Sequence, residues 1–64
     1  MPWTASDYPA SMRHLSEPAR AKAIEIANAL LDGGMDEGKA IRIAIAKAGQ
    51  WAQRLDLPAR DDEL

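Results

Sequence analysis

His14 is the only side chain of this sequence that could act as an imidazole base, and the chain contains no cysteine that could act as a thiolate nucleophile. Nucleophilic catalysis needs a nucleophile, a base and a third group that orients the base. Ser11 and Ser16 lie near His14 along the chain, but proximity in sequence does not assemble such a set. A surface histidine explains His14 better, so we predict no catalytic residue and no enzymatic activity.

Two clusters of acidic residues are the other candidates for acid–base chemistry. Asp36 and Glu37 stand where the start of a helix favours negative charge, because the helix dipole is positive there. The second cluster, residues 61–63, belongs to an acidic stretch that offers no apolar walls for a site. We interpret both clusters as structural and not as catalytic.

Metal and cofactor sites are not expected either. A chain without cysteine and with one histidine cannot build a thiolate or multi-histidine metal site. Residues 32–38 resemble the start of a calcium loop, but Glu37 stands where that loop needs glycine and Ile43 where it needs glutamate. Gly33, Gly34 and Gly38 lack the preceding strand and the lysine of a phosphate-binding loop. We therefore predict no cofactor and no metal, and we identify no small-molecule substrate.

A basic stretch is the remaining candidate site. No acidic residue occurs between Lys39 and Leu55, and Ile43 projects among the basic residues of a predicted helix. A solvated face is the commonest meaning of such a pattern, and docking of a protein or of nucleic acid are the two functional alternatives. The candidate interaction face comprises Lys39, Arg42, Ile43, Lys47, Gln50 and Arg54.

The composition favours helices as the elements that carry this face. Thirteen of the 64 residues are alanine, whereas valine and phenylalanine are absent, which promotes helix and disfavours sheet. We predict an all-α helical hairpin with main helices over about 17–32 and 36–55. Gly33-Gly34 ends the first helix, and a connection this short makes the two helices neighbours. An N-terminal arm with a short helical turn after Pro9 packs against them.

Apolar residues recur in steps of three and four along both predicted helices, which is the helical period. Ser16 and Asp36 are the expected N-caps. We expect the second helix to end before Leu57-Pro58, because the residue before proline avoids helical geometry. In the first helix the expected core residues are Ala19, Ala23, Ile26, Ala27, Leu30 and Leu31, with Ile24 at the edge and Lys22, Glu25, Asn28 and Asp32 opposite. In the second they are Ile41, Ala44, Ile45, Ala48, Ala52 and Leu55, with Trp51 at the edge. From the arm they are Trp3, Tyr8, Met12 and Leu15.

The length of the chain limits how many domains it can form. A chain of 64 residues makes one small domain of marginal stability, predicted here over residues 1–57, with a flexible acidic tail over 58–64. Without disulfides or a metal, association with another protein or with a second copy, as a homodimer, is the remaining source of extra stability. No apolar run approaches the length of a membrane span, and no secretory signal is recognised, so we expect a cytoplasmic protein.

Ordered blocks of residues resemble a family of short bacterial proteins of unknown function. These blocks are Met1-Pro2-Trp3, Asp7-Tyr8-Pro9, Ser11-Met12, Leu15, and residues 22–31, 36–41, 43–45 and 51–52. More distantly, the Met-Pro-aromatic opening, the second proline-led helix, and Ala48 with Trp51 are similar to the ChaB-like family of proposed cation transport regulators. That resemblance implies an accessory protein and supplies no catalytic residue.

The sequence therefore favours a non-enzymatic accessory or adaptor protein that acts through a helical protein-interaction surface. The alternative is a nucleic-acid-binding accessory protein that uses the same basic face. The net charge of −2 argues against a strong general preference for nucleic acid. An enzyme would need a site assembled between chains from residues that look ordinary here.

Overall fold

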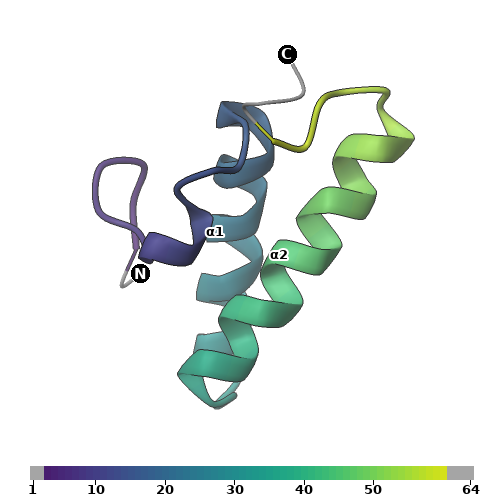
Figure 1. The fold of residues 1–64 in the computed structure, drawn as a ribbon. Coiled ribbons are helices and arrows are strands. Elements are labelled where there is room, and N and C mark those ends of the chain that lie inside the picture. The colour runs from purple at the N-terminus through teal and green to yellow at the C-terminus, as the bar shows by residue number, and fades with distance from the viewer. Residues whose placement is uncertain (1–2, 61–64) are drawn as a thin grey trace.

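The protein is an all-α helical hairpin with a short N-terminal arm, as the sequence predicts. The computed structural model describes residues 3–60 and contains the 3-10 helix η1 (Ala10–Met12) and the α-helices α1 (Glu17–Asp32) and α2 (Glu37–Arg54). Between residues 3 and 60 there is no strand, only two isolated β-bridges. In Figure 1, α1 lies between the arm on one side and α2 on the other.

Both α-helices begin at the predicted caps. The Ser16 hydroxyl accepts a hydrogen bond from the Ala19 N–H at 3.4 Å, and the Asp36 carboxylate accepts one from the Lys39 N–H at 3.1 Å. Each cap satisfies one of the backbone donors that a helix start leaves without an intrahelical partner. The limits of α1 agree with the prediction, and α2 is one residue shorter at each end.

Both α-helices end in the same backbone arrangement, although the residue types differ. Gly34 closes α1 with a φ of 90°, and the next N–H, from Met35, donates to the Leu30 carbonyl. After α2 the corresponding residue is Asp56, with a φ of 59°, and the Leu57 N–H donates to the Ala52 carbonyl. This pattern is the Schellman motif, whose left-handed position usually holds glycine. Asp56 therefore carries a conformational cost that Gly34 does not.

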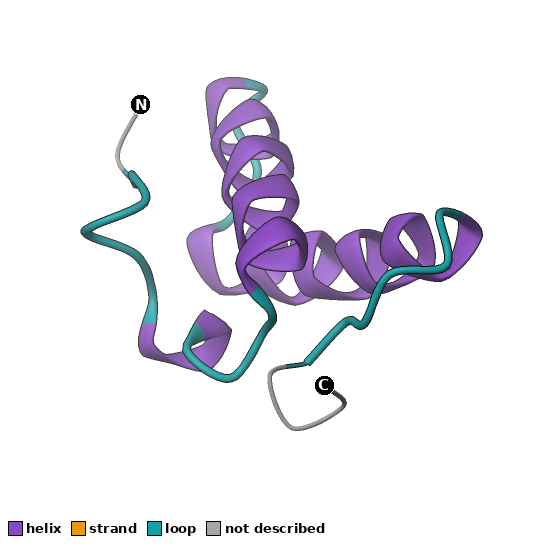
Figure 2. Ribbon diagram, turned by 90° about the horizontal axis from the view of Figure 1, so that it is seen from above, coloured by secondary structure: helices purple, strands orange, loops and turns teal. Residues whose placement is uncertain are grey.

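Alanine rows form the centre of the hairpin. Ala19, Ala23 and Ala27 of α1 are fully buried, and they share one apolar cluster with alanines of α2. All four residues of the α2 row are also fully buried: Ala40, Ala44, Ala48 and Ala52. Rows spaced by four residues that interdigitate favour a steep helix crossing, and Figures 1 and 2 show the two helix axes inclined to each other.

The larger apolar residues of α2 flank these rows and are less buried than the alanines. Ile41, Ile45 and Trp51 are half-buried against the cluster, while Met12 and Leu15 from the arm are buried within it. Leu55, expected in the α2 stripe, is 55% exposed. The prediction for Leu55 was wrong because α2 ends at Arg54, so the helical period stops one residue before it.

Asn28 is a second correction, since it was expected on the solvent face. It is 2% exposed and exchanges two hydrogen bonds with the backbone of Trp3. The Trp3 N–H donates to Asn28 Oδ1 at 3.3 Å, and Asn28 Nδ2 donates to the Trp3 carbonyl at 3.0 Å. The Asn28 amide therefore both donates to and accepts from the backbone of Trp3. These two bonds satisfy the buried amide and the backbone N–H and carbonyl of Trp3.

The described part of the predicted tail returns to the start of α1. The Ser16 hydroxyl donates to the Pro58 carbonyl at 2.6 Å, and the Ser16 N–H donates to the Ala59 carbonyl at 3.0 Å. Leu15 and Arg60 form an isolated antiparallel bridge. Residues 58–60 are thus held against the domain. The rest of the expected tail, 61–64, lies outside the described residues, and its flexibility stays a prediction.

Candidate interaction groove

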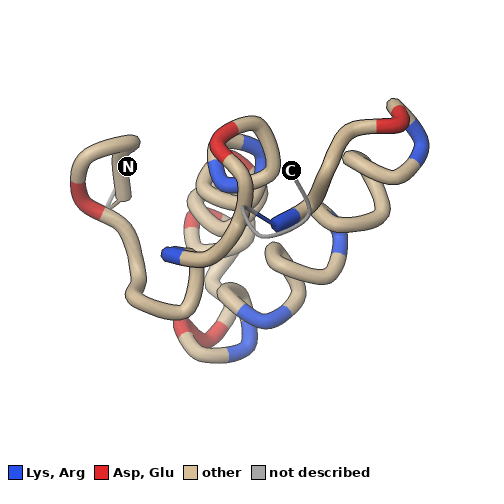
Figure 3. The backbone as a smooth tube through the Cα atoms, turned by 45° about the horizontal axis from the view of Figure 1, so that its top comes forward, with Lys and Arg blue, Asp and Glu red and all other residues tan. Residues whose placement is uncertain are grey.

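The predicted interaction face lies along α2. Lys39, Arg42, Lys47, Gln50 and Arg54 are exposed. Ile43, predicted to project among them, is half-buried. Figure 3 shows Lys and Arg recurring along α2, with Asp and Glu confined to its start and to the segment beyond its end.

Three of these six residues line a groove between the two helices. Lys47, Gln50 and Arg54 face Lys22 and Ile26 of α1, with Trp51 also in the lining. The groove has a volume of about 440 Å³. Lys39, Arg42 and Ile43 are not among its lining residues. We call this site the α1–α2 groove and define it by Lys22, Ile26, Lys47, Gln50, Trp51 and Arg54.

Lys22 and Ile26 were missed as site residues from the sequence. Lys22 was placed on the face opposite the core and Ile26 within the core, yet Ile26 is only half-buried. The two residues are four positions apart and therefore lie on the same flank of α1. That spacing was visible in the sequence, but it does not say which flank of α1 faces the basic side of α2.

Lys22 reaches over the groove. Its ammonium nitrogen lies 5.7 Å from the centroid of the Trp51 ring, and 3.1 Å from Glu25 Oε1. The first contact is a cation–π interaction and the second is an exposed ion pair one turn along α1. Both interactions are weak individually at such exposure, so Lys22 can leave them when a stronger anionic partner approaches.

Lys47 and Arg54 complete the positive charge of the groove. Within residues 3–60 neither of them forms an ion pair. Among the described residues, 3–60, the lining contains three cations and no carboxylate, and Lys22 pairs with Glu25 outside the lining. The lining also contains the apolar side chains Ile26 and Trp51, which are half-buried, whereas Lys47 and Arg54 are exposed. We call Ile26 and Trp51 the apolar floor of the groove and the cations its positive rim.

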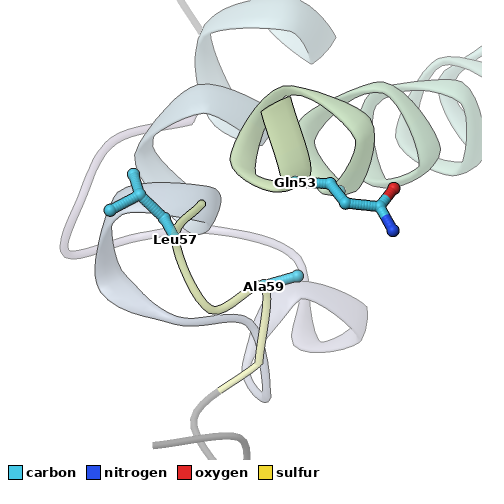
Figure 4. A pocket seen from close by; sticks show the side chains of 4 residues that line it. Gln53, Leu57 and Ala59 are labelled. Carbon is cyan, nitrogen blue, oxygen red and sulfur yellow. The ribbon is translucent and has the colours of Figure 1, made fainter. Parts of the chain in front are cut away.

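A second hollow lies on the other flank of α2. It is lined by Gly49, Gln53, Leu57 and Ala59 and has a volume of about 240 Å³. In Figure 4, Gln53 extends from α2, whereas Leu57 and Ala59 belong to the segment that returns to α1. None of its lining residues between positions 3 and 60 is charged, so this described lining offers less for specific recognition than that of the α1–α2 groove.

The other chemical candidates stay apart. His14 is exposed, as are Ser11 and the pair Asp36 and Glu37. Ser16 is buried, and its hydroxyl is engaged by Ala19 and Pro58. In the part of the chain that the structure describes, no three residues of the His, Cys, Asp and Glu types are grouped closely enough to hold a metal ion. In the same part, no helix is long and apolar enough to cross a membrane.

Comparison with known proteins agrees with the bacterial resemblance seen in the sequence. The chain is 52% identical over all of its 64 residues to the uncharacterized protein YdaT of Bacillus subtilis (strain 168). It spans 43% of the length of that protein. No protein-family model and no solved structure matches the chain. The chain is therefore related to a bacterial protein of unknown function, and the ChaB-like resemblance stays a prediction.

Proposed function

We propose that the protein is a non-enzymatic, cytoplasmic accessory protein that binds another protein through the α1–α2 groove. The observation that carries this proposal is that one groove brings half-buried Ile26 and Trp51 together with Lys47 and Arg54, which form no ion pair within residues 3–60. Apolar anchors surrounded by a polar rim are typical of protein-binding surfaces, where tryptophan and arginine contribute most. The proposal concerns this chain, which spans less than half of YdaT.

The test is photo-crosslinking in the organism that makes the protein. A photoreactive amino acid replaces Gln50 in the groove, and a matched variant carries it at Arg42, which is also exposed on α2 but outside the groove. We expect a discrete protein adduct from position 50 and a much weaker one from position 42, both read by mass spectrometry. Equal labelling from the two positions, or labelling of nucleic acid only, would contradict the proposal.

Nucleic-acid binding is the second candidate function, and the cations along α2 favour it. Lys39 and Arg42 would extend the positive surface of the groove along the same helix. Phosphate contacts would release counterions, so the affinity for labelled duplex DNA or RNA would fall steeply with salt. The apolar floor favours a protein partner instead, because phosphates gain nothing from contact with Ile26. A titration at two salt concentrations separates the two functions.

A further inference from the structure

We infer that the α1–α2 groove receives an acidic amphipathic helix of the partner protein. This inference rests on the proposed function and specifies the chemistry of the segment that binds. The groove presents three cations, from Lys22, Lys47 and Arg54, around the apolar floor of Ile26 and Trp51. A segment that complements it carries carboxylates on both sides of an apolar surface.

The groove favours a helical segment over an extended one. An extended peptide gains affinity mainly by pairing its backbone with the edge of a sheet. Residues 3–60 contain no strand that could supply such an edge. A helix satisfies its own backbone hydrogen bonds and lays one apolar face into a groove between helices. An amphipathic helix is therefore the segment that binds without leaving unpaired backbone groups.

The spacing of the cations sets the spacing of the carboxylates. Lys47 and Arg54 are seven residues apart on α2, which is two helical turns or about 10 Å along the axis. A partner helix that lies along α2 matches them with carboxylates at its own positions i and i+7. Its apolar residues at i+3 and i+4 then face Trp51, which also lines the groove and stands about one helical turn from each cation along α2.

Lys22 supplies the third contact from the opposite wall. Its ammonium group is shared between Glu25 and the Trp51 ring, so it already lies across the groove. An incoming carboxylate competes with Glu25 for this group. Removal of the Glu25 charge therefore strengthens binding of an acidic helix, because it removes both the competitor and a repelling charge.

The experiment uses the full chain and a synthetic, hydrocarbon-stapled helical peptide. The peptide has about 15 residues, since shorter unsupported helices are marginal in water. It carries glutamates at i and i+7 and leucines at i+3 and i+4 on an alanine–glutamine background. A control peptide of the same composition moves the glutamates to the face opposite the leucines. Binding is measured by fluorescence anisotropy of the labelled peptide and by NMR shifts of the Trp51 indole N–H.

We expect the first peptide to bind at least about tenfold more tightly than its control, because only it brings carboxylates to the groove. The double variant Lys47→Glu/Arg54→Glu should lose about tenfold or more in affinity, while Lys39→Glu/Arg42→Glu should change it by less than about threefold. Glu25→Gln should tighten binding by about twofold. Circular dichroism of each variant distinguishes lost binding from lost folding.

Two outcomes would overturn the inference, and they differ in what they leave standing. Equal affinity for the two peptides, or no binding of either, would reject the acidic helix as the partner segment. The proposed function would still stand if the photoreactive residue at position 50 crosslinked to a protein. Salt-sensitive binding of duplex DNA without binding of either peptide, together with crosslinks to nucleic acid alone, would reject both.

Discussion

The two sides of α1 are held to their neighbours by opposite means. Toward α2, Ala19, Ala23 and Ala27 form a fully buried row without a single polar atom in its side chains. Toward the terminal segments, a parallel row offers hydrogen bonds instead. That row is spaced by four residues from the N-cap of α1 onward, and its polar members are Ser16, Arg20 and Asn28, with apolar Ile24 between the last two.

The polar members of this row join α1 to residues 3–15 and 55–60, which contain no α-helix. Arg20 donates to the carbonyls of Met12, Arg13 and Leu15, and its guanidinium lies 4.9 Å from the Tyr8 ring centroid. Ser16 and Asn28 hold residues 58–59 and residue 3 in the same way. A helix satisfies its own backbone hydrogen bonds and packs against another helix through shape, whereas less regular segments leave backbone groups that polar side chains of α1 help to satisfy.

The largest expected effect comes from enlarging a residue of the alanine row. Ala48→Leu inserts three carbon atoms at a fully buried site between two closely packed helices, which should lower the free energy of unfolding by about 2 to 3 kcal/mol. The matched control is Ala46→Leu, at an exposed position of the same helix. Urea titrations of both variants measure the difference, and equal stabilities would show that the row is not tightly packed.

Asn28→Ala should have the next largest effect and should act on the arm. The substitution removes both hydrogen bonds to Trp3, at a cost of about 2 kcal/mol. Hydrogen exchange should accelerate in the arm before it does in α2. Uniform acceleration in both regions would contradict a separate anchoring of the arm.

Two N-cap variants should come next. Ser16 caps α1 and also holds a remote segment, whereas Asp36 only caps α2, so Ser16→Ala and Asp36→Ala can be compared. Loss of a cap alone costs about 1 kcal/mol, and this is the value expected for Asp36→Ala. Ser16 additionally donates to the Pro58 carbonyl, so Ser16→Ala should cost about 0.5 to 1 kcal/mol more. Thermal and urea unfolding measure both variants. If Ser16→Ala cost no more than Asp36→Ala, the contact with Pro58 would contribute nothing to stability.

Leu55→Gln should have the smallest effect, although the sequence pattern placed Leu55 in the core. Its side chain is 55% exposed, and substitutions at such positions generally change stability by less than about 0.5 kcal/mol. The same substitution at Leu15, which is buried, provides the contrast. A loss above about 1.5 kcal/mol for Leu55→Gln would show that α2 and its apolar stripe extend further in solution.

The sequence predicted the hairpin well because its signals are local. The caps Ser16 and Asp36, the Gly33-Gly34 stop and the period of the alanine rows each act within a few residues, so they could be recognised without a structure. Asn28 could not be recognised in this way, because its partner is 25 residues away on an irregular segment. Polar residues near an apolar stripe predict solvent exposure unless the long-range partner is known.

The candidate site was predicted on one wall only. Lys47, Gln50 and Arg54 were selected as a basic face of one helix, which the spacing along α2 predicts. The opposite wall, Lys22 and Ile26, depends on how the two helices cross and on which flanks meet, and this follows from packing across the hairpin. Lys39 and Arg42 share the charge pattern of the face but lie beyond the groove.

The hydrogen bonds of Ser16 with Pro58 and Ala59 close a ring of chain that contains both helices, with a sequence separation of 42 residues for the first of them. Long loops are entropically costly to close, but the cost rises only slowly with length. These hydrogen bonds hold the first turn of α1 against the segment that follows α2, so the two should separate together. The amide of Ser16, at a position where a helix would ordinarily fray, should therefore exchange with solvent only when the whole domain opens.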